Sequence, residues 1–278
     1  MSPIPHTFHY RACAHAFSGN FTRPFQHHID VQAPISLPTT GGHGHNRVEN
    51  FQFREFISFA KGYTQVSGSL EKDGSHNTLA TAVVEGLNVM DVLTADRIVA
   101  HVSSRHHKDT PEGEISLIGS KFENLKIAGC PVNVELDHEL LNEVLTFKLA
   151  KDSFKNKGKL FTAAAKPFRT LAEDISVDDP HAKDLAEDHP EIEPGDHGPI
   201  LFSCVKKTEV KCPGVFRRGR HGFYIRGFGR VFLGEVLIKH GEKTITMVRL
   251  ELGSAVSVSG TVSEASSNGS PWPPPPGG

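Results

Sequence analysis

A short motif that recurs three times constrains the fold of this chain more than any other feature of its sequence. V-E-N-F-Q-F at 48–53 returns as V-E-G-L-N-V at 84–89 and as F-E-N-L-K-I at 122–127. The offsets are 84 − 48 = 36 and 122 − 84 = 38 residues, which is the size of one supersecondary unit used repeatedly. The first two copies align without a gap, since 51–73 lies over 87–109.

The repeat has the residue pattern of β-strands. Apolar and polar residues alternate over 96–102, and valine and threonine are frequent, with Gly, Asp and Ser at the breaks. We predict strands at 78–84 and 96–102, separated by a turn near Met90 and Asp91. The predicted fold class is therefore mainly β, with repeated strand units that form a β-sandwich or a stacked β-sheet. The repeat units lie near 48–73, 84–109 and 116–136.

One composite β domain is expected to cover residues 1–262, with a helical and acidic insertion at 137–198. Apolar residues between Asp137 and Asn156 have roughly helical spacing, and Asp137 is a suitable N-cap, which predicts one amphipathic helix there. Residues 173–197 carry ten acidic side chains against one lysine, which predicts an exposed excursion.

Strands are predicted to return after the insertion and to end before a tail. The C-terminal strands are expected within 199–262. Residues 263–278 are rich in Ser, Gly and Pro, which predicts a disordered or polyproline II tail.

Charge and hydropathy exclude several classes of protein. The 278 residues include 30 Lys and Arg against 32 Asp and Glu, so the balance gives no general reason to expect nucleic acid as a partner. No stretch approaches the ~20 apolar residues of a membrane span. Residues 1–17 lack the basic and apolar regions of a secretory signal. We therefore expect a cytoplasmic protein with no membrane span.

Four cysteines bear on the redox compartment: Cys13, Cys130, Cys204 and Cys212. None forms a C-x-x-C pair, so neither a zinc knuckle nor a thioredoxin-type motif is present. Reduced thiols are the expectation for a cytoplasmic protein. In an oxidising compartment, Cys204 and Cys212, which flank a basic segment, are the pair that could cross-link.

The segment from Gly86 to Ser104, followed by F-E-N-L-K-I-A-G, resembles the choice-of-anchor P proteins. In those bacterial β-rich proteins a valine-rich strand precedes a similar G-L and T-A-D segment and then an L-x-I-x-G strand. Here 94–96 and 125–127 stand at those places. The resemblance covers about residues 12–136 and implies a β fold and an uncharacterised function. Because no export signal or hydrophobic anchor is visible, we do not expect the surface location usual in that family.

Histidine is unusually frequent, with 17 residues in the chain. On a strand, His43 and His45 point to the same face and form a workable half-site for Zn²⁺ or Cu²⁺. His106 and His107 are adjacent, so on a strand they point to opposite faces and make a poorer chelate. These four histidines are the candidate metal ligands. Solvated histidines in turns are the competing interpretation, because a metal site needs three or four converging ligands.

A second candidate site is basic. Its members are Lys206, Lys207, Lys211, Arg217, Arg218, Arg220 and Arg226. Aromatic residues at 216, 223 and 224 lie nearby, and arginine with aromatic rings can bind phosphate or stacked bases. Arg217, Arg218 and Arg220 are the candidate anion ligands. Two other interpretations are a solvated loop and a docking surface for the acidic residues 173–197.

Three glutamates at equivalent positions of the repeat, Glu49, Glu85 and Glu123, favour a structural contact, because active sites are rarely triplicated. The leading hypothesis is a non-catalytic structural or binding protein that self-assembles into a homo-oligomer or binds a protein partner, because repeated sheets leave open edges. The alternatives are a histidine-dependent metal-binding protein or metalloenzyme, and a phosphate or polyanion binder that uses the arginines at 217–220.

Overall fold

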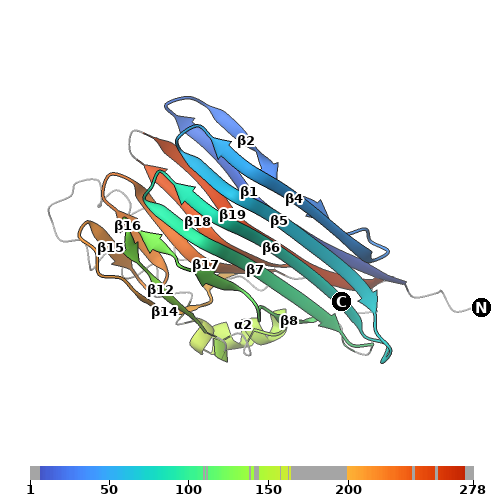
Figure 1. The fold of residues 1–278 in the computed structure, drawn as a ribbon. Helices are drawn as coiled ribbons and strands as arrows, with labels where there is room; N and C mark the ends of the chain where they lie inside the picture. The colour runs from blue at the N-terminus through green and yellow to red at the C-terminus, as the bar shows by residue number, and fades with distance from the viewer. Residues whose placement is uncertain are drawn as a thin grey trace, which may run out of the picture.

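The first two copies of the repeat form two consecutive β-hairpins in the computed structural model (Figure 1). The hairpins are β4 (Gly42–Phe53) with β5 (Ile57–Leu70), and β6 (His76–Val89) with β7 (Leu93–His106). A shift of 36 residues carries 57–70 onto 93–106, so β5 falls on β7, and it carries β4 onto 78–89, which lies within β6. The predicted strands at 78–84 and 96–102 and the turn at Met90 are confirmed.

The structure describes residues 7–163 and 199–272, except for 109, 111, 138, 141–143, 157, 162, 240, 241, 254, 255 and the side chain of Arg218. The predicted acidic excursion at 173–197 lies outside the described residues.

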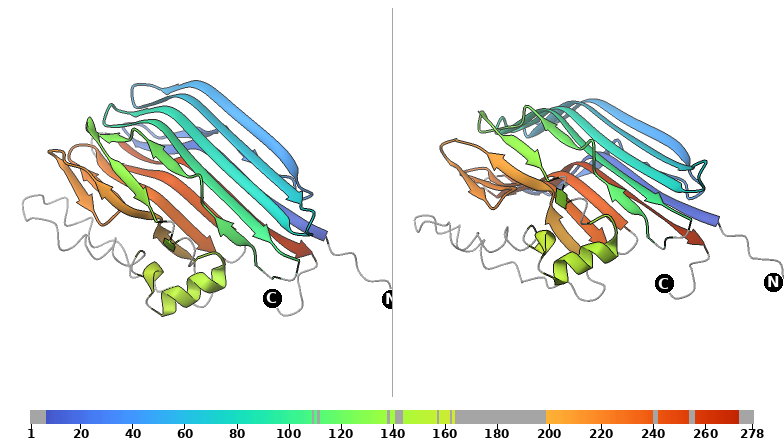
Figure 2. Two further views of the ribbon diagram at one scale, coloured as in Figure 1. Left: turned by 60° about the horizontal axis from the view of Figure 1, so that its bottom comes forward. Right: turned by 90° about the horizontal axis from the view of Figure 1, so that it is seen from below.

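Two antiparallel sheets lie face to face (Figure 2), which confirms the mainly β fold class. Sheet A has the order β15 (Val215–Arg218), β16 (Gly222–Ile225), β17 (Gly229–Lys239), β18 (Glu242–Gly253), β19 (Ser257–Trp272), β1 (Thr7–Arg23) and β2 (His27–Gln32). Two short strands pair beside this path, β13 (Ile200–Ser203) with β17 and β3 (Ile35–Ser36) with β1.

Sheet B has the order β11 (Cys130–Pro131), β10 (Lys126–Ile127), β7, β6, β5 and β4. Two more short strands, β8 (Glu114–Ser116) and β9 (Lys121–Glu123), pair with β7. A third sheet has two antiparallel strands, β12 (Asn133–Leu136) and β14 (Val205–Glu209). β12 follows the last strand of sheet B in the chain, and β14 follows β13 of sheet A.

Each copy of the repeat ends in a turn of the same backbone conformation. Arg54, Met90 and Ala128 occupy equivalent positions and have φ angles of 50°, 52° and 49°. The turns stack on one another, because the N–H of Met90 donates to the carbonyl of Phe56 and the N–H of Ala128 donates to the carbonyl of Val92. The third copy, which has only short strands, therefore continues the stack and is part of the same repeat.

A second position of the repeat also has a left-handed backbone conformation in all three copies, and this row of residues across sheet B is called the crease below. Asn50, Gly86 and Asn124 are equivalent in the three copies and have φ angles of 52°, 68° and 50°. Glycine and asparagine tolerate this region better than other residues, which explains why the motif has them there. The residue after each of them is apolar and packs into or against the core: Phe51, Leu87 and Leu125.

Just before the crease, a row of alternating charges crosses the outer face of sheet B. Glu49 lies opposite Lys61, Lys61 opposite Glu85, Glu85 opposite Arg97, and Arg97 opposite Glu123. The Arg97 and Glu85 side chains approach to 3.5 Å. Opposite charges on facing strands stabilise a sheet modestly, by about 0.2–1 kcal/mol for each pair. The position of the three glutamates supports the structural interpretation of their repetition.

The prediction of a disordered tail from residue 263 was wrong for Ser263–Trp272, which belong to β19. This strand lies between β18 and β1 and pairs with both along most of its length. Two of its serines are buried between the sheets and hydrogen-bond to sheet B. The Ser263 hydroxyl donates to the Ile98 carbonyl, and the Ser267 hydroxyl donates to the Thr78 carbonyl. Small hydroxyl side chains therefore replace apolar ones where the two sheets approach. Residues 273–278 lie outside the described residues.

The prediction of one helix over 137–156 was also wrong. The described helix, α2 (Phe147–Lys155), covers only the second half of that range, because residues 144–146 are not helical. Residues 139 and 140 are helical as well, and the Leu140 N–H donates to the Asp137 carboxylate, as the predicted N-cap requires. Thr146 is the N-cap, and the Glu112 carboxylate accepts from the N–H groups of Phe147 and Lys148. A carboxylate from a distant loop thus sets the start of the helix.

Candidate functional site

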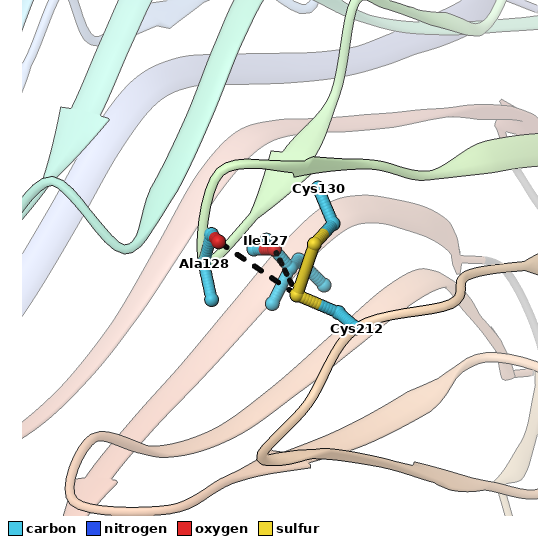
Figure 3. The surroundings of a disulfide bond; sticks show 4 residues. All are labelled: Ile127, Ala128, Cys130 and Cys212. Carbon is cyan, nitrogen blue, oxygen red and sulfur yellow. Dashed lines mark hydrogen bonds between the residues drawn. A yellow bond between two sulfur atoms is a disulfide. The ribbon is translucent and has the colours of Figure 1, made fainter.

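The ribbon formed by β12 and β14 is cross-linked at one end by a disulfide between Cys130 and Cys212 (Figure 3). The last pair of the ribbon is Asn133 with Glu209, and each cysteine lies three residues beyond that pair. The disulfide therefore attaches the segment after β14 to the third turn of the repeat. Figure 3 also shows the Cys212 sulfur beside the carbonyl oxygens of Ile127 and Ala128, each at 3.7 Å.

This pairing corrects two expectations from the sequence, namely that the thiols are reduced and that Cys204 is the cysteine that could pair with Cys212. Cys212 bonds Cys130 and not Cys204, which is buried and unpaired. Burial raises the pKa of the Cys204 thiol to about 12, so that thiol is unreactive. Cys130 and Cys212 are separated by 82 residues, and only the packing of sheet B against the chain after β13 brings them together.

The basic corner is defined here as Lys207 and Lys211, which lie close to the buried Thr208 along the chain, and Arg217 and Arg220, which hydrogen-bond to it. The Arg217 guanidinium donates to the Thr208 carbonyl at 3.1 Å, and the Thr208 hydroxyl donates to the Arg220 carbonyl at 2.9 Å. Thr208 is 1% exposed, so each hydrogen bond is buried at its Thr208 end, whereas Arg217 itself is exposed. One buried residue of β14 thus fixes both sides of the turn between β15 and β16.

The basic corner contains more positive charge than its own carboxylate neutralises. Glu209 pairs with Lys207 at 2.5 Å. That hydrogen bond and charge raise the pKa of Lys207, as does the charge of Glu135, while burial and the nearby positive charge of Arg217 act against this rise. Among the described residues, Lys211, Arg217 and Arg220 form no ion pair within 4.0 Å. Unneutralised cations held near one another favour the binding of an anion.

Two of the three arginines predicted to bind an anion contact Thr208, Arg217 through its side chain and Arg220 through its backbone carbonyl. Arg217 is exposed and Arg220 half-buried, both beside Thr208. The backbone of Arg218 pairs with Gly222, and its side chain lies outside the described part of the molecule. The sequence did not point to Thr208, because a lone threonine between lysines has no distinguishing pattern.

An exposed aromatic ring lies at the same edge of sheet A. Phe216 is 41% exposed, and its ring centroid is 6.1 Å from that of Tyr224 on the paired strand. Because neighbouring residues of a strand point to opposite faces, Phe216 and Arg217 flank the edge of β15 on its two sides. A ligand that runs along this edge can contact both.

The candidate metal ligands are not brought together. His43 and His45 are exposed on the outer face of β4, whereas Gly44 between them faces Ile35 and Val66. This is the same-face arrangement that the His-x-His spacing predicts. Among the described residues, no group of three or more His, Cys, Asp or Glu side chains could hold a metal ion.

The other two candidate ligands have different environments. His106 is buried between the sheets, with its ring 5.1 Å from that of Phe8, whereas His107 is exposed on the loop that follows β7. Burial, then the charges of Lys243 and His76, lower the pKa of His106 to about 4. Lys243 is itself buried and donates to the carbonyls of Gly113 and Leu145.

The buried imidazole predicts a loss of stability in mild acid. The folded state keeps His106 neutral down to about pH 4, but the unfolded chain takes up a proton at its ordinary pKa of 6.5. The stability that the neutral ring contributes is present above pH 6.5 and is lost as the pH falls toward 4, by about 3 kcal/mol. Urea unfolding at pH 7 and pH 4 measures this difference. His106→Leu should reduce it, and His107→Leu should not.

A buried ion network lies on the outer face of sheet A. The Arg249 guanidinium donates to both carboxylate oxygens of Glu235, at 2.6 and 2.8 Å, and lies 3.9 Å above the Phe232 ring. Glu235 is 7% exposed, and His221 approaches it to 3.7 Å. Burial raises the pKa of Glu235, but the hydrogen bonds and charges of Arg249 and His221 outweigh it and hold the pKa at about 2.

The fold is an antiparallel β-sandwich with a disulfide-linked ribbon, and residues of this ribbon and of the β15 edge of sheet A form the basic corner beside an exposed aromatic ring. Residues 8–239 match the family described as Domain of unknown function (DUF8256), and the chain belongs to this family. No curated protein and no solved structure matches the chain. The resemblance to choice-of-anchor P proteins stays a prediction. None of the described helices is long and apolar enough to cross a membrane.

Proposed function

We propose that the chain is a binding protein that holds an anionic polysaccharide at the basic corner. One observation carries the proposal: Thr208 hydrogen-bonds the Arg217 side chain and the Arg220 backbone, so that four cationic residues lie near one another, with Glu135 and Glu209 as the carboxylates beside Lys207. The hydrogen bond to the Thr208 carbonyl holds the Arg217 guanidinium in place before a ligand arrives. Such preorganisation lowers the entropic cost of binding.

Two further features favour a polysaccharide over a nucleic acid. The exposed Phe216 ring offers an apolar face at the edge where the cations lie, and the apolar face of a sugar ring can stack on it. The Cys130–Cys212 disulfide supports an oxidising compartment, in place of the cytoplasm expected from the sequence. Outside the cytoplasm, acidic and sulfated polysaccharides are the abundant polyanions.

Binding to a heparin oligosaccharide is expected to fall in a Lys211→Gln/Arg217→Gln variant. Removing two cations should weaken binding by about tenfold or more, and should reduce the slope of log affinity against log salt concentration by about two. The measurement is titration calorimetry at several salt concentrations. Lys72→Gln is the matched control, because this exposed lysine lies in the turn between β5 and β6, at the other end of the sandwich (Figure 1).

The same titrations distinguish the class of ligand. The proposal requires that heparin bind more tightly than a DNA duplex of equal charge, and that Phe216→Ser weaken heparin binding. Equal affinity for DNA would contradict the choice of a polysaccharide. Unchanged affinity in the double variant would contradict the site itself.

A further inference from the structure

Strand β4 forms one edge of sheet B and is much longer than the strands at the other sheet edges. It has 12 residues, whereas β2 has 6, β15 has 4 and β11 has 2. None of its 12 residues is buried, and among the described residues its backbone pairs only with β5. A long open edge presents unpaired N–H and C=O groups, which is a template for another strand.

The direction of the free donors on β4 follows from one hydrogen bond. The Arg47 N–H donates to the Asn46 side-chain oxygen at 2.8 Å, so it points away from β5. In an antiparallel strand the direction alternates from residue to residue, so the N–H groups of His43, His45 and Glu49 also point outward. Asn46 occupies one of these four donors, and the crease at Asn50 ends the run.

The charges on the outer face of β4 are incomplete within one copy of the chain. Glu49 is the last member of the charge row, with no strand beyond it. In the next row Arg47 lies opposite Tyr63, and its ion pair is with Glu49 of its own strand, at 3.7 Å between two exposed side chains. An antiparallel copy of β4 centred on Val48 places Arg47 opposite Glu49 of the second copy, and Glu49 opposite its Arg47.

From the open edge and this charge pattern we infer that two copies of the chain pair through β4, antiparallel about a two-fold axis at Val48. The pairing joins the two B sheets into one continuous sheet and extends each charge row by one ion pair. It exchanges the bond between the Arg47 N–H and Asn46 for a main-chain bond to the second copy. This inference is independent of the proposed function, because the basic corner lies beyond the opposite edge of sheet B (Figure 1).

The test is a charge reversal and a charge swap on β4. The wild-type chain should have a mass in light scattering of twice its 30.3 kDa. Arg47→Glu places like charges opposite each other in both ion pairs and should raise the dissociation constant about tenfold or more. Arg47→Glu/Glu49→Arg restores opposite charges across the axis and should restore the dimer. Rescue by the swap would not follow from damage to the fold.

Two further variants locate the interface. His45→Pro removes an outward N–H without removing a bond to β5, and should also weaken the dimer. Arg11→Glu reverses an exposed charge on β1, a strand inside sheet A, and should leave the dimer intact. A monomeric wild-type chain, a dimeric Arg47→Glu chain, or a swap that stays monomeric would each overturn the inference.

Discussion

Removing the Cys130–Cys212 disulfide is expected to lower the free energy of unfolding by ~4.5 kcal/mol. The bond closes a loop of 82 residues, and the chain-entropy relation gives this value for a loop of that length. The loop includes the ribbon of β12 and β14, and α2. Reduction of the disulfide therefore frees this long segment in the unfolded chain.

Urea unfolding of the Cys130→Ala/Cys212→Ala variant, compared with the oxidised wild type, measures the effect. Cys13→Ser is the matched control, because Cys13 is exposed and unpaired, and it should leave the unfolding free energy unchanged. A thiol assay on the denatured, unreduced wild type should find two free thiols, Cys13 and Cys204. Four free thiols, or a double variant as stable as the wild type, would contradict the pairing.

The second large effect is expected at the buried ion network of sheet A. Arg249→Met removes the guanidinium that binds both oxygens of Glu235 and leaves a carboxylate that is 7% exposed without its main partner. Breaking a buried ion pair from one side costs about 3–5 kcal/mol. The sandwich should lose that much unfolding free energy at pH 7, as measured by urea unfolding.

The pH dependence of this loss identifies its cause. In Arg249→Met only His221 remains to lower the pKa of Glu235 against burial, so that pKa should rise from about 2. Wild-type Glu235, whose folded pKa lies below the unfolded value, contributes stability at pH 7 that is lost as the pH falls, and this contribution shrinks when the folded pKa rises. The loss relative to wild type should therefore be smaller at pH 4 than at pH 7.

A double variant separates the pair from general packing damage. Glu235→Leu/Arg249→Met removes both charges, and replacement of a buried pair by apolar residues is often close to neutral. The double variant should therefore be more stable than Arg249→Met alone. If it is no more stable than the single variant, the loss comes from packing around Phe232 and not from an unpaired carboxylate.

The hairpins were predictable from the sequence because their cause is local. Alternation of apolar and polar residues sets which face of a strand is buried, and the recurring motif placed the turn at Met90 correctly. The same alternation predicted that His43 and His45 share a face. It could not say whether a third ligand lies near them, because convergence depends on which strands are neighbours.

The part of β19 from Ser263 to Trp272 was missed because its polar residues resemble a linker. Ser263 and Ser267 are buried only because β18 and β1 lie on either side and the carbonyls of sheet B accept hydrogen bonds from their hydroxyls. No Val, Leu or Ile follows Val262 in the sequence, so local propensity favoured a linker for a segment whose stability as a strand comes from its partners.

By itself, the sequence determined the repeat, its strands, the turn near Met90 and the basic character of residues 206–226, because these depend on neighbours along the chain. Only the tertiary structure decided the partner of Cys212, the tethering of Arg217 and Arg220 to Thr208, and the open edge at β4. Those features join residues that lie far apart in the chain or depend on where a sheet ends. Their energies arise when the sheets close on one another, and no local pattern records that event.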